Sequence, residues 1–386
     1  MPTPPADAPA SPLRGNFVSE WFGHRVHPAV TESLESLADQ RAARCPFLST
    51  ATRETTACVK SPAARGICTI SSCSNGPRQD WLVCPYRALD FRLFENAAQR
   101  LFAPVRVTPL IVVSAPTLLA DDVRTRVAET IQSGGKAVVF LQAKLGGEIS
   151  LAPTERSPEV SFDTTLVEIV TREGAFDIGR YGILEVQTMD FHGTYRHAVK
   201  NLTDALRLHG EEFHRVLQEN QGRWISEEIE GPNIANVFKR TFYQMMLKFQ
   251  IGESSAGCVL ALPAAVWDSW QRHLGKPELT RNPDDTFTLS KPGGLPPGHV
   301  PAWIYVFDLD ASSSVTPNPV VIQKVIATDA DSVAYYAVKV APEIAIAEGG
   351  TAGALSATIR RRLASWWPAL GGSSTGRRRG TPKLGR

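Results

Sequence analysis

Apolar residues recur at regular spacing mainly in the second and third quarters of the chain. Short runs rich in β-branched residues predict strands at residues 109–114, 137–141, 162–171, 181–188, 259–262 and 303–309. Stripes with a spacing of three and four predict helices at residues 121–133, 197–217 and 233–249. The turn residues at 282–285 predict a link between two further short strands. This mixture predicts an α/β fold with a mixed central sheet flanked by helices.

The ends of the chain and its N-terminal part have a different pattern. Residues 1–15 are rich in proline and predict a disordered leader. Residues 16–90 show few periodic stretches, so we expect a loop-rich region whose order depends on its cysteines. Residues 91–370 should form the core of the protein, and residues 371–386 a flexible basic tail. A cationic tail suits phosphate contact, although it could equally be a solubilising terminus.

The charge balance excludes extreme classes of protein. Among 386 residues, 41 are Lys or Arg and 39 are Asp or Glu, which gives a net charge of +2. A polybasic histone-like protein and an acidic disordered chain are therefore excluded, whereas a local basic patch for nucleic acid is not. No apolar run approaches the ~20 residues of a membrane span, and the first residues lack the features of a secretory signal. We expect a soluble cytoplasmic protein without a membrane partner.

Most of the cysteines are clustered. Five of the six fall within 40 residues and only Cys258 lies elsewhere; the five are Cys45, Cys58, Cys68, Cys73 and Cys84. A reducing compartment disfavours disulfides, so a thiolate site for zinc or iron is the sharper interpretation. The intervals are wider than the usual C-x-x-C pairs, which leaves scattered buried thiols as the alternative. Cys258 opens an apolar strand and is expected in the core.

The predicted strand at 181–188 carries candidate chemistry. With a side-chain period of two, Glu185 and Gln187 project from one face and the residues between them from the other. A carboxylate within an apolar strand is costly without a partner, and a divalent cation is a natural one. Asp163 opens a strand that could pair beside it, and Glu148 is a further candidate, so these carboxylates are candidate ligands for a magnesium site of the kind used for phosphodiester hydrolysis. An ordinary hydrogen-bonded strand carboxylate is the alternative.

The predicted helix at 233–249 interleaves polar and apolar residues. Its aromatic and Met positions are expected in the core; they are Phe238, Phe242 and Met245. Its polar positions are candidates for phosphate or guanine contacts, against the alternative of a solvated face; they are Lys239, Arg240, Tyr243, Gln244 and Lys248. Arg87 sits close to Cys84 and is a further candidate for DNA binding, positioned by the cysteine region.

Several blocks of sequence resemble one enzyme family. They include GILEVQTMDFHGTYRHAV, EGPNIANVFKRTFYQM, SPEVSFDTTL and KLGGEIS, together with CPFL, CVK, RGIC and DWLVCPYRALD around the cysteines. Taken in the order in which they occur along the chain, these blocks resemble the NotI-like family of type II restriction endonucleases, within the PD-(D/E)xK nuclease superfamily. The likeness runs from residue 16 to about residue 310 and weakens towards the basic C-terminus.

The resemblance implies roles for the acidic residues. It implies a PD-(D/E)xK core in which Asp163 and Glu185 bind magnesium, Gln187 lies next to the attacking water and Glu148 belongs to the same active site. Gln187 stands where the common nuclease pattern has Lys, and an amide carries no charge. The positive charge that this Lys supplies in the common pattern must therefore come from the metal or from another cation. Asp190, His192 and Tyr195 follow closely and are expected to support the site or contact DNA.

The resemblance also implies a structural metal. It implies that four cysteines hold one iron in a tetrahedral site, with zinc as the alternative; these are Cys45, Cys58, Cys68 and Cys84. Cys73 has no counterpart in the family pattern, so we expect it to be a free thiol on a loop. The alternative is that Cys73 takes the place of Cys68 as a metal ligand.

The expected function is that of a magnesium-dependent type II restriction endonuclease. The resemblance implies double-strand cleavage at a GC-rich palindrome, GCGGCCGC or a related site centred on CGGCCG. A palindromic duplex calls for a homodimer, and a cognate DNA methyltransferase would protect the bacterial host. Two alternatives stay open, a cleavage-inactive DNA-binding protein with a structural metal and a thiolate-metal protein with a redox or sensing role.

Overall fold

A computed structural model describes residues 13–74, 76–103, 108–310, 313, 315, 317–349 and 352–368. The basic tail at 371–386 and all but the last three residues of the predicted leader lie outside this range. Those three residues are attached to the body, because the backbone N–H groups of Arg14 and Gly15 both donate to Glu227 Oε1.

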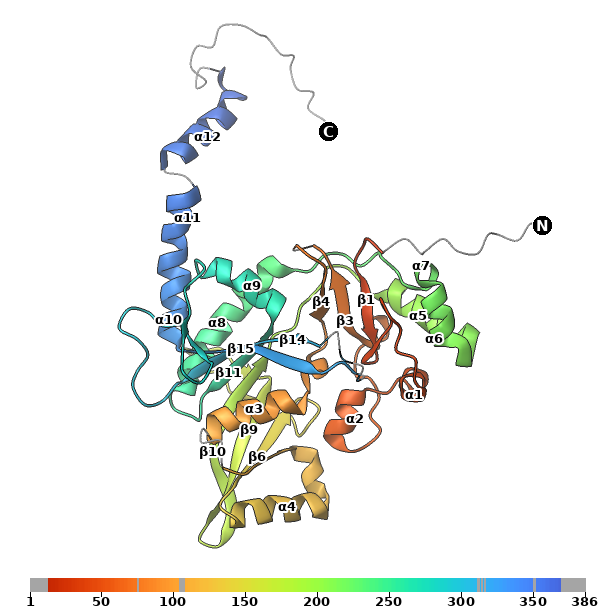
Figure 1. Ribbon diagram of the computed structural model, residues 1–386. Coiled ribbons are helices and arrows are strands. Elements are labelled where there is room, and N and C mark those ends of the chain that lie inside the picture. Colours follow the sequence, from red (N-terminus) through yellow and green to blue (C-terminus); the bar gives the residue numbers. More distant parts are fainter. Residues whose placement is uncertain are drawn as a thin grey trace, which may run out of the picture.

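A nine-stranded mixed sheet forms the centre of the described structure (Figure 1). Its strands follow the order β12-β13-β15-β14-β11-β10-β9-β6-β5. Their bounds are β5 (Leu110–Ser114), β6 (Lys136–Gln142), β9 (Thr164–Arg172), β10 (Ala175–Val186), β11 (Cys258–Pro263), β12 (Thr280–Arg281), β13 (Phe287–Thr288), β14 (Ala302–Leu309) and β15 (Val320–Thr328). The pairs β10–β11, β11–β14, β5–β6 and β13–β15 are parallel, and the other neighbours are antiparallel. The predicted α/β architecture with a mixed sheet is confirmed.

Helices cover both faces of this sheet. On one face, Ile183, Leu260 and Ile304 pack with α8 (Ile234–Gly252) and α9 (Ala264–His273). On the other face, the alternate residues Leu184, Val259 and Trp303 pack with α3 (Phe91–Phe102). A third cluster joins α4 (Asp121–Gln132) to β5 and β6. Because neighbouring residues of a strand point to opposite faces, Glu185 lies on the side of the sheet that α8 covers.

The N-terminal region has more regular structure than predicted. It contains an antiparallel sheet of order β2-β1-β3-β4. The bounds are β1 (Phe17–Trp21), β2 (His24–Arg25), β3 (Ile67–Ser72) and β4 (Gln79–Leu82), with α1 (Leu34–Ala42) and α2 (Pro46–Thr52) beside them. Every residue of β1 and β3 is buried, including the serines and threonines. The expectation of a loop-rich region was therefore wrong, because strands buried on both faces show no polar–apolar alternation.

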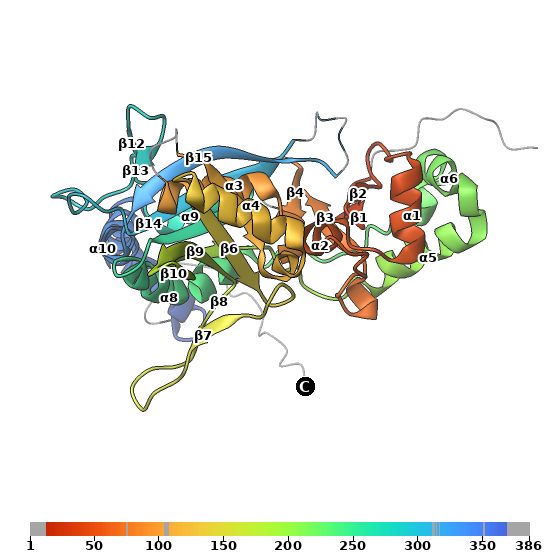
Figure 2. The same cartoon turned by 90° about the horizontal axis from the view of Figure 1, so that it is seen from below.

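The predicted helix at 197–217 is interrupted. It forms α5 (Arg196–His209) and α6 (Phe213–Glu219), separated by a 3₁₀ turn that begins at Gly210. Gly210 has φ of +54°, a left-handed value that an ordinary residue adopts only with strain. Both views place α5 and α6 beside α1, at the end of the molecule that the N-terminal sheet forms (Figures 1 and 2).

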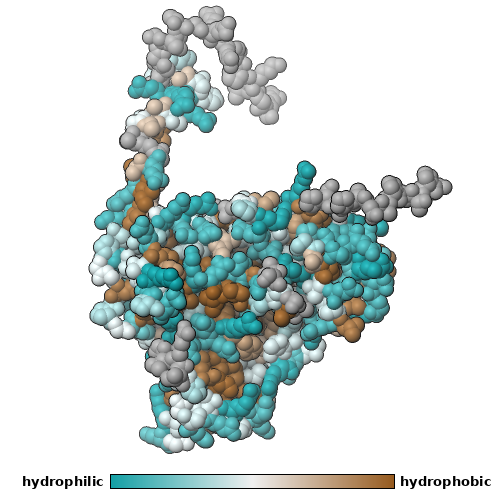
Figure 3. All heavy atoms as spheres, in the orientation of Figure 1, coloured by the Kyte–Doolittle hydropathy of each residue, from teal (hydrophilic) through white to brown (hydrophobic). Residues whose placement is uncertain are grey.

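The C-terminal helices leave the body of the protein. After α10 (Ala330–Tyr335) and a π-helical segment (Tyr336–Val340), α11 (Ala341–Gly349) and α12 (Ala352–Ala364) extend outwards (Figure 1). Ile346, Leu355 and Trp366 are exposed on this arm, and Figure 3 shows apolar side chains along it. None of the helices in the described part of the chain has the length and apolar character needed to cross a membrane.

Candidate active site

The register of two strands brings the predicted carboxylates together. β9 and β10 are antiparallel, with Thr164 opposite Leu184, so Asp163 lies beside Glu185. The backbone N–H of Asp163 donates to Glu185 Oε1 over 3.0 Å, and the backbone N–H of Val186 donates to Asp163 Oδ2 over 3.4 Å. The prediction that the strand opening at Asp163 pairs beside the Glu185 strand is confirmed.

Glu185 is held in a buried environment. It is 8% exposed, and its Oε2 lies 2.5 Å from Nζ of Lys248. Burial, and then the charge of Asp163, raise the pKa of Glu185 to about 7, although the ammonium of Lys248 opposes both effects. Asp163 itself is exposed. One carboxylate of the pair is therefore buried against a cation, and the other faces solvent.

Gln187 shares the face of Glu185, as the strand period predicts. Its Oε1 accepts a hydrogen bond from Thr241 Oγ1 of α8 over 2.7 Å. Its Nε2 donates to the backbone oxygen of Thr188 over 2.6 Å. The amide is thus fixed in orientation between the strand end and the helix, and it brings no charge to the site.

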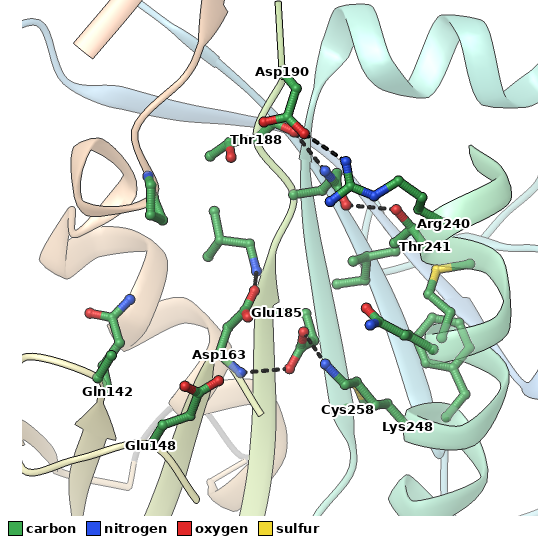
Figure 4. A pocket seen from close by; sticks show the side chains of 18 of the residues that line it. Gln142, Glu148, Asp163, Glu185, Thr188, Asp190, Arg240, Thr241, Lys248 and Cys258 are labelled. Carbon is green, nitrogen blue, oxygen red and sulfur yellow. Dashed lines mark hydrogen bonds and ion pairs between the residues drawn. The ribbon is translucent and has the colours of Figure 1, made fainter. Parts of the chain in front are cut away.

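One cavity of about 370 Å³ contains all four predicted catalytic side chains (Figure 4). They are Glu148, Asp163, Glu185 and Gln187. Glu148 directly precedes β7 (Ile149–Leu151) and Asp163 directly follows β8 (Val160–Phe162). These two strands pair as a hairpin that projects from the body in Figure 2, so the hairpin joins two of the acidic residues.

The donor atoms of the cavity suit a hard divalent cation. Within the described residues, no three His, Cys, Asp or Glu side chains form a group that could hold a metal ion. Magnesium, however, is commonly bound through one or two carboxylates and keeps several waters. Asp163 and Glu185 supply that set, and they would be the residues that hold the ion. Gln142 lines the same cavity at 5% exposure, and its buried Oε1 has no hydrogen-bond partner among the residues that the structure describes.

Three residues of the site were not assigned to it from the sequence. Lys248 and Thr241 reach the cavity from α8, and Gln142 reaches it from the end of β6. Thr241 and Lys248 are seven residues apart, which places them on one face of a helix, two turns from each other. That spacing is visible in the sequence, but it does not show which strand the face meets. Lys248 is 4% exposed, so it does not lie on the solvated helix face that was the alternative to its predicted phosphate or guanine contact.

The other DNA-binding candidates of α8 occupy different positions. Arg240 and Gln244 are exposed and line the cavity, and Arg240 NH1 lies 2.8 Å from Asp190 Oδ2. Lys239 is exposed but is not among the residues that line the cavity. Phe238 and Met245 are buried, which confirms their expected place in the core.

The position of Arg87 does not agree with its predicted role in DNA binding. Arg87 is 2% exposed, and its Nε and NH2 donate to the two carboxylate oxygens of Glu20 over 2.7 and 2.9 Å. NH2 also donates to the backbone oxygen of Asn318 over 2.6 Å. Burial raises the pKa of Glu20, but the charge and hydrogen bonds of Arg87 outweigh it, so that this pKa is lowered overall. We therefore assign Arg87 to the interior, where it ties β1 to a distant loop.

The four cysteines of the predicted metal site lie near one another but do not converge. Cys68 donates a hydrogen bond to the sulfur of Cys84, and this bond, helped by the charge of Lys60 against the effect of burial, lowers the pKa of Cys84 to about 6. Burial, and additionally the charges of Cys84 and Cys58, raise the pKa of Cys45 to about 11. In this arrangement no three of the described thiols are grouped to hold an ion, so binding one metal requires side-chain rearrangement.

Two of these cysteines occupy equivalent local positions. Cys45 precedes Pro46 at the start of α2, and Cys84 precedes Pro85 at the start of a 3₁₀ helix (Pro85–Ala88). Each sulfur accepts hydrogen bonds from backbone N–H groups of the helix that follows it. Free N–H groups at a helix start stabilise a thiolate, which is the form that binds metal, but at Cys45 the effect of burial on the pKa outweighs them.

The remaining two cysteines lie apart from this group. Cys73 is exposed after β3, and its sulfur lies 3.8 Å from the backbone oxygen of Arg14. This position agrees with the expected free thiol on a loop. Cys258 is the first residue of β11 and is fully buried, which confirms the prediction of a core residue.

Comparison of this chain with protein-family models and with curated protein sequences gives no match.

Proposed function

We infer that this protein is a magnesium-dependent, site-specific DNA endonuclease of the PD-(D/E)xK type. The observation that carries the proposal is the meeting of Asp163, Glu185, Gln187 and Glu148 in one cavity, on strands whose register sets two carboxylates side by side. A buried carboxylate with a raised pKa beside a second carboxylate is typical of a functional site. Arg240, exposed at the lining of the cavity, is a cation that an anionic substrate can contact.

The residues of the chain have distinct roles in this proposal. Asp163 and Glu185 hold the cation, which when bound supplies charge neutralisation of the phosphate and a more acidic water. Gln187, whose amide is fixed by Thr241, would hold the attacking water by a hydrogen bond. Glu148 lies at the exposed side of the cavity, where its carboxylate can accept a proton or a hydrogen bond. Arg240 and Gln244 flank the cavity and contact the DNA.

The wider proposal follows the family resemblance. The duplex is a GC-rich palindrome, GCGGCCGC or a related site centred on CGGCCG, and the protein acts on it as a homodimer. A cognate methyltransferase protects the host DNA in the bacterial cytoplasm. The four clustered cysteines hold a structural iron, or zinc, once their side chains converge.

Digestion of a genome of known sequence tests the function directly. Purified protein with magnesium should produce ends that share one GC-rich palindrome, whereas EDTA should prevent cleavage. Glu185→Ala and Asp163→Ala should abolish cleavage yet retain site-specific binding in a mobility-shift assay with calcium, because each removes a cation ligand and no base contact. Ends without a shared sequence would leave only a non-specific nuclease, and unchanged cleavage by either variant would remove the assigned active site.

A further inference from the structure

The cavity contains a buried basic side chain that contacts Glu185, the neighbour of the uncharged Gln187 on the same strand face. Of the described residues that line the cavity, Arg240 and Lys248 are the basic ones. Arg240 is exposed and paired with Asp190, whereas Lys248 is buried with its ammonium against Glu185 (Figure 4). Gln187, the neighbour of Glu185 on the same strand face, brings no charge.

The placement of Lys248 is set by helix α8. Lys248 lies two turns after Thr241 on the face that contains Met245, which is buried in the same core. Thr241 binds Gln187 and Lys248 binds Glu185, so the helix contacts two strand residues that are themselves two positions apart. A buried ammonium is costly unless it is paired, and an ammonium has three N–H donors. Among the described residues, its one hydrogen bond is to Glu185 Oε2.

The two oxygens of Glu185 are both occupied in this arrangement. Oε1 accepts from the backbone N–H of Asp163. This N–H group lies between β8 and β9, so the two strands fix its position. Oε2 accepts from the side chain of Lys248, which has four rotatable bonds and can move. Asp163 and Glu185 would hold a cation, and that cation would compete with the ammonium of Lys248 for Oε2.

We propose that Lys248 is a catalytic residue that supplies, from helix α8, the positive charge that strand position 187 lacks. It holds Oε2 of Glu185 in the metal-free protein, yields that oxygen when the cation binds, and then donates to the phosphate of the substrate. This inference rests on the proposed function for its substrate, but the exchange at Glu185 does not depend on cleavage.

Two opposite effects follow from removing the ammonium. Lys248→Met keeps an apolar stem of similar length but leaves Oε2 free beside a second carboxylate, so a divalent cation should bind more tightly. The phosphate loses its charged partner at the same time, so cleavage should become slower. A residue that served only to keep the helix packed would weaken cation binding and cleavage together.

Calcium titration of the metal-free protein by calorimetry measures the first effect. Lys248→Met should bind calcium at least about tenfold more tightly than the wild type, the scale of one hydrogen bond to a charged group. Lys248→Arg, which retains the charge, should stay close to the wild type. Lys200→Met is the matched control, because it removes an exposed lysine that pairs with Asp204 over 2.6 Å outside the cavity. Calcium affinity of Lys248→Met equal to or weaker than that of the wild type would overturn the proposal.

Single-turnover cleavage with magnesium measures the second effect. Lys248→Met should cleave at least about a hundredfold more slowly despite its tighter cation binding, and Lys248→Arg should recover part of the rate. Cleavage by Lys248→Met at the wild-type rate would refute the phosphate role. If the wild type cleaves no duplex, the proposed function fails, while the calcium titration still decides the exchange at Glu185. If Lys248→Met does not fold, Lys248→Gln provides the same uncharged comparison in both assays.

Discussion

The raised pKa of Glu185 predicts how the stability of the metal-free protein depends on pH. The unfolded carboxyl titrates near 4.5 and the folded one near 7. Between these values the folded protein keeps a proton that the unfolded chain has released, so the free energy of unfolding falls as the pH rises through this window. The interval is about 2.5 pH units. At about 1.4 kcal/mol per unit, Glu185 weakens the folded state by about 3 kcal/mol above pH 7.

Glu185→Gln isolates this effect because an amide does not ionise. The variant also lacks the ion pair with Lys248, but the effect of that pair on the ionisation of Glu185 is already contained in the folded pKa of about 7. The pH-dependent difference between the two proteins therefore comes from the ionisation of the Glu185 carboxyl. The free energy of unfolding of the variant minus that of the wild type should therefore rise by about 3 kcal/mol from pH 4.5 to pH 8. Titrating groups that do not interact with residue 185 behave alike in both proteins and cancel in the difference.

Urea denaturation in EDTA, followed by tryptophan fluorescence at several pH values, measures this difference. Glu148→Gln is the matched control, since Glu148 is an exposed carboxyl of the same cavity. The free energy of unfolding of Glu148→Gln minus that of the wild type should stay constant within about 0.5 kcal/mol from pH 4.5 to pH 8. If the curves of Glu185→Gln and the wild type run parallel from pH 4.5 to pH 8, the burial of Glu185 and its repulsion by Asp163 have been misjudged.

Three further predictions concern the interior, the cysteines and the DNA surface. Arg87→Met should lower the free energy of unfolding by about 3–5 kcal/mol in urea, because it leaves Glu20 charged and unpaired in the interior; a loss below about 1 kcal/mol would contradict this assignment. Elemental analysis should give about one metal per chain for the wild type and for Cys73→Ser, but none for Cys58→Ser; the reverse pattern would exclude the proposed ligand set. Arg240→Ala should weaken duplex binding in calcium and reduce its salt dependence by about one counterion, and an unchanged salt slope would remove Arg240 from the phosphate contacts.

Much of the central sheet was predictable because its signals are local. Runs of β-branched residues marked β5, β6, β10, β11 and β14, and a period of two placed Glu185 and Gln187 on one face. The pairing of Asp163 beside Glu185 followed from two strands joined across a short turn. Such features depend on residues within one strand or within two strands that follow each other in the chain, so the sequence is enough to show them.

The N-terminal sheet shows where a local signal is lost. Its serines and threonines are buried within β1 and β3, so polar residues there do not mark a solvent-facing side. A period of two appears only when one face of a strand meets water, and these strands are covered on both faces. The sequence pattern of such a segment looks irregular although the structure is regular.

The partners of the buried charges were decided by tertiary structure alone. Arg87 looked like a surface cation beside a cysteine, yet its partner is Glu20, in a strand from the start of the chain. Lys248 looked like one more polar position of a helix, yet it reaches Glu185 on a strand that precedes it by three helices. A residue's spacing shows which face of its own element it occupies. Which opposite charge it meets depends on how distant segments pack, since a buried charge is stable only where that packing brings it a partner.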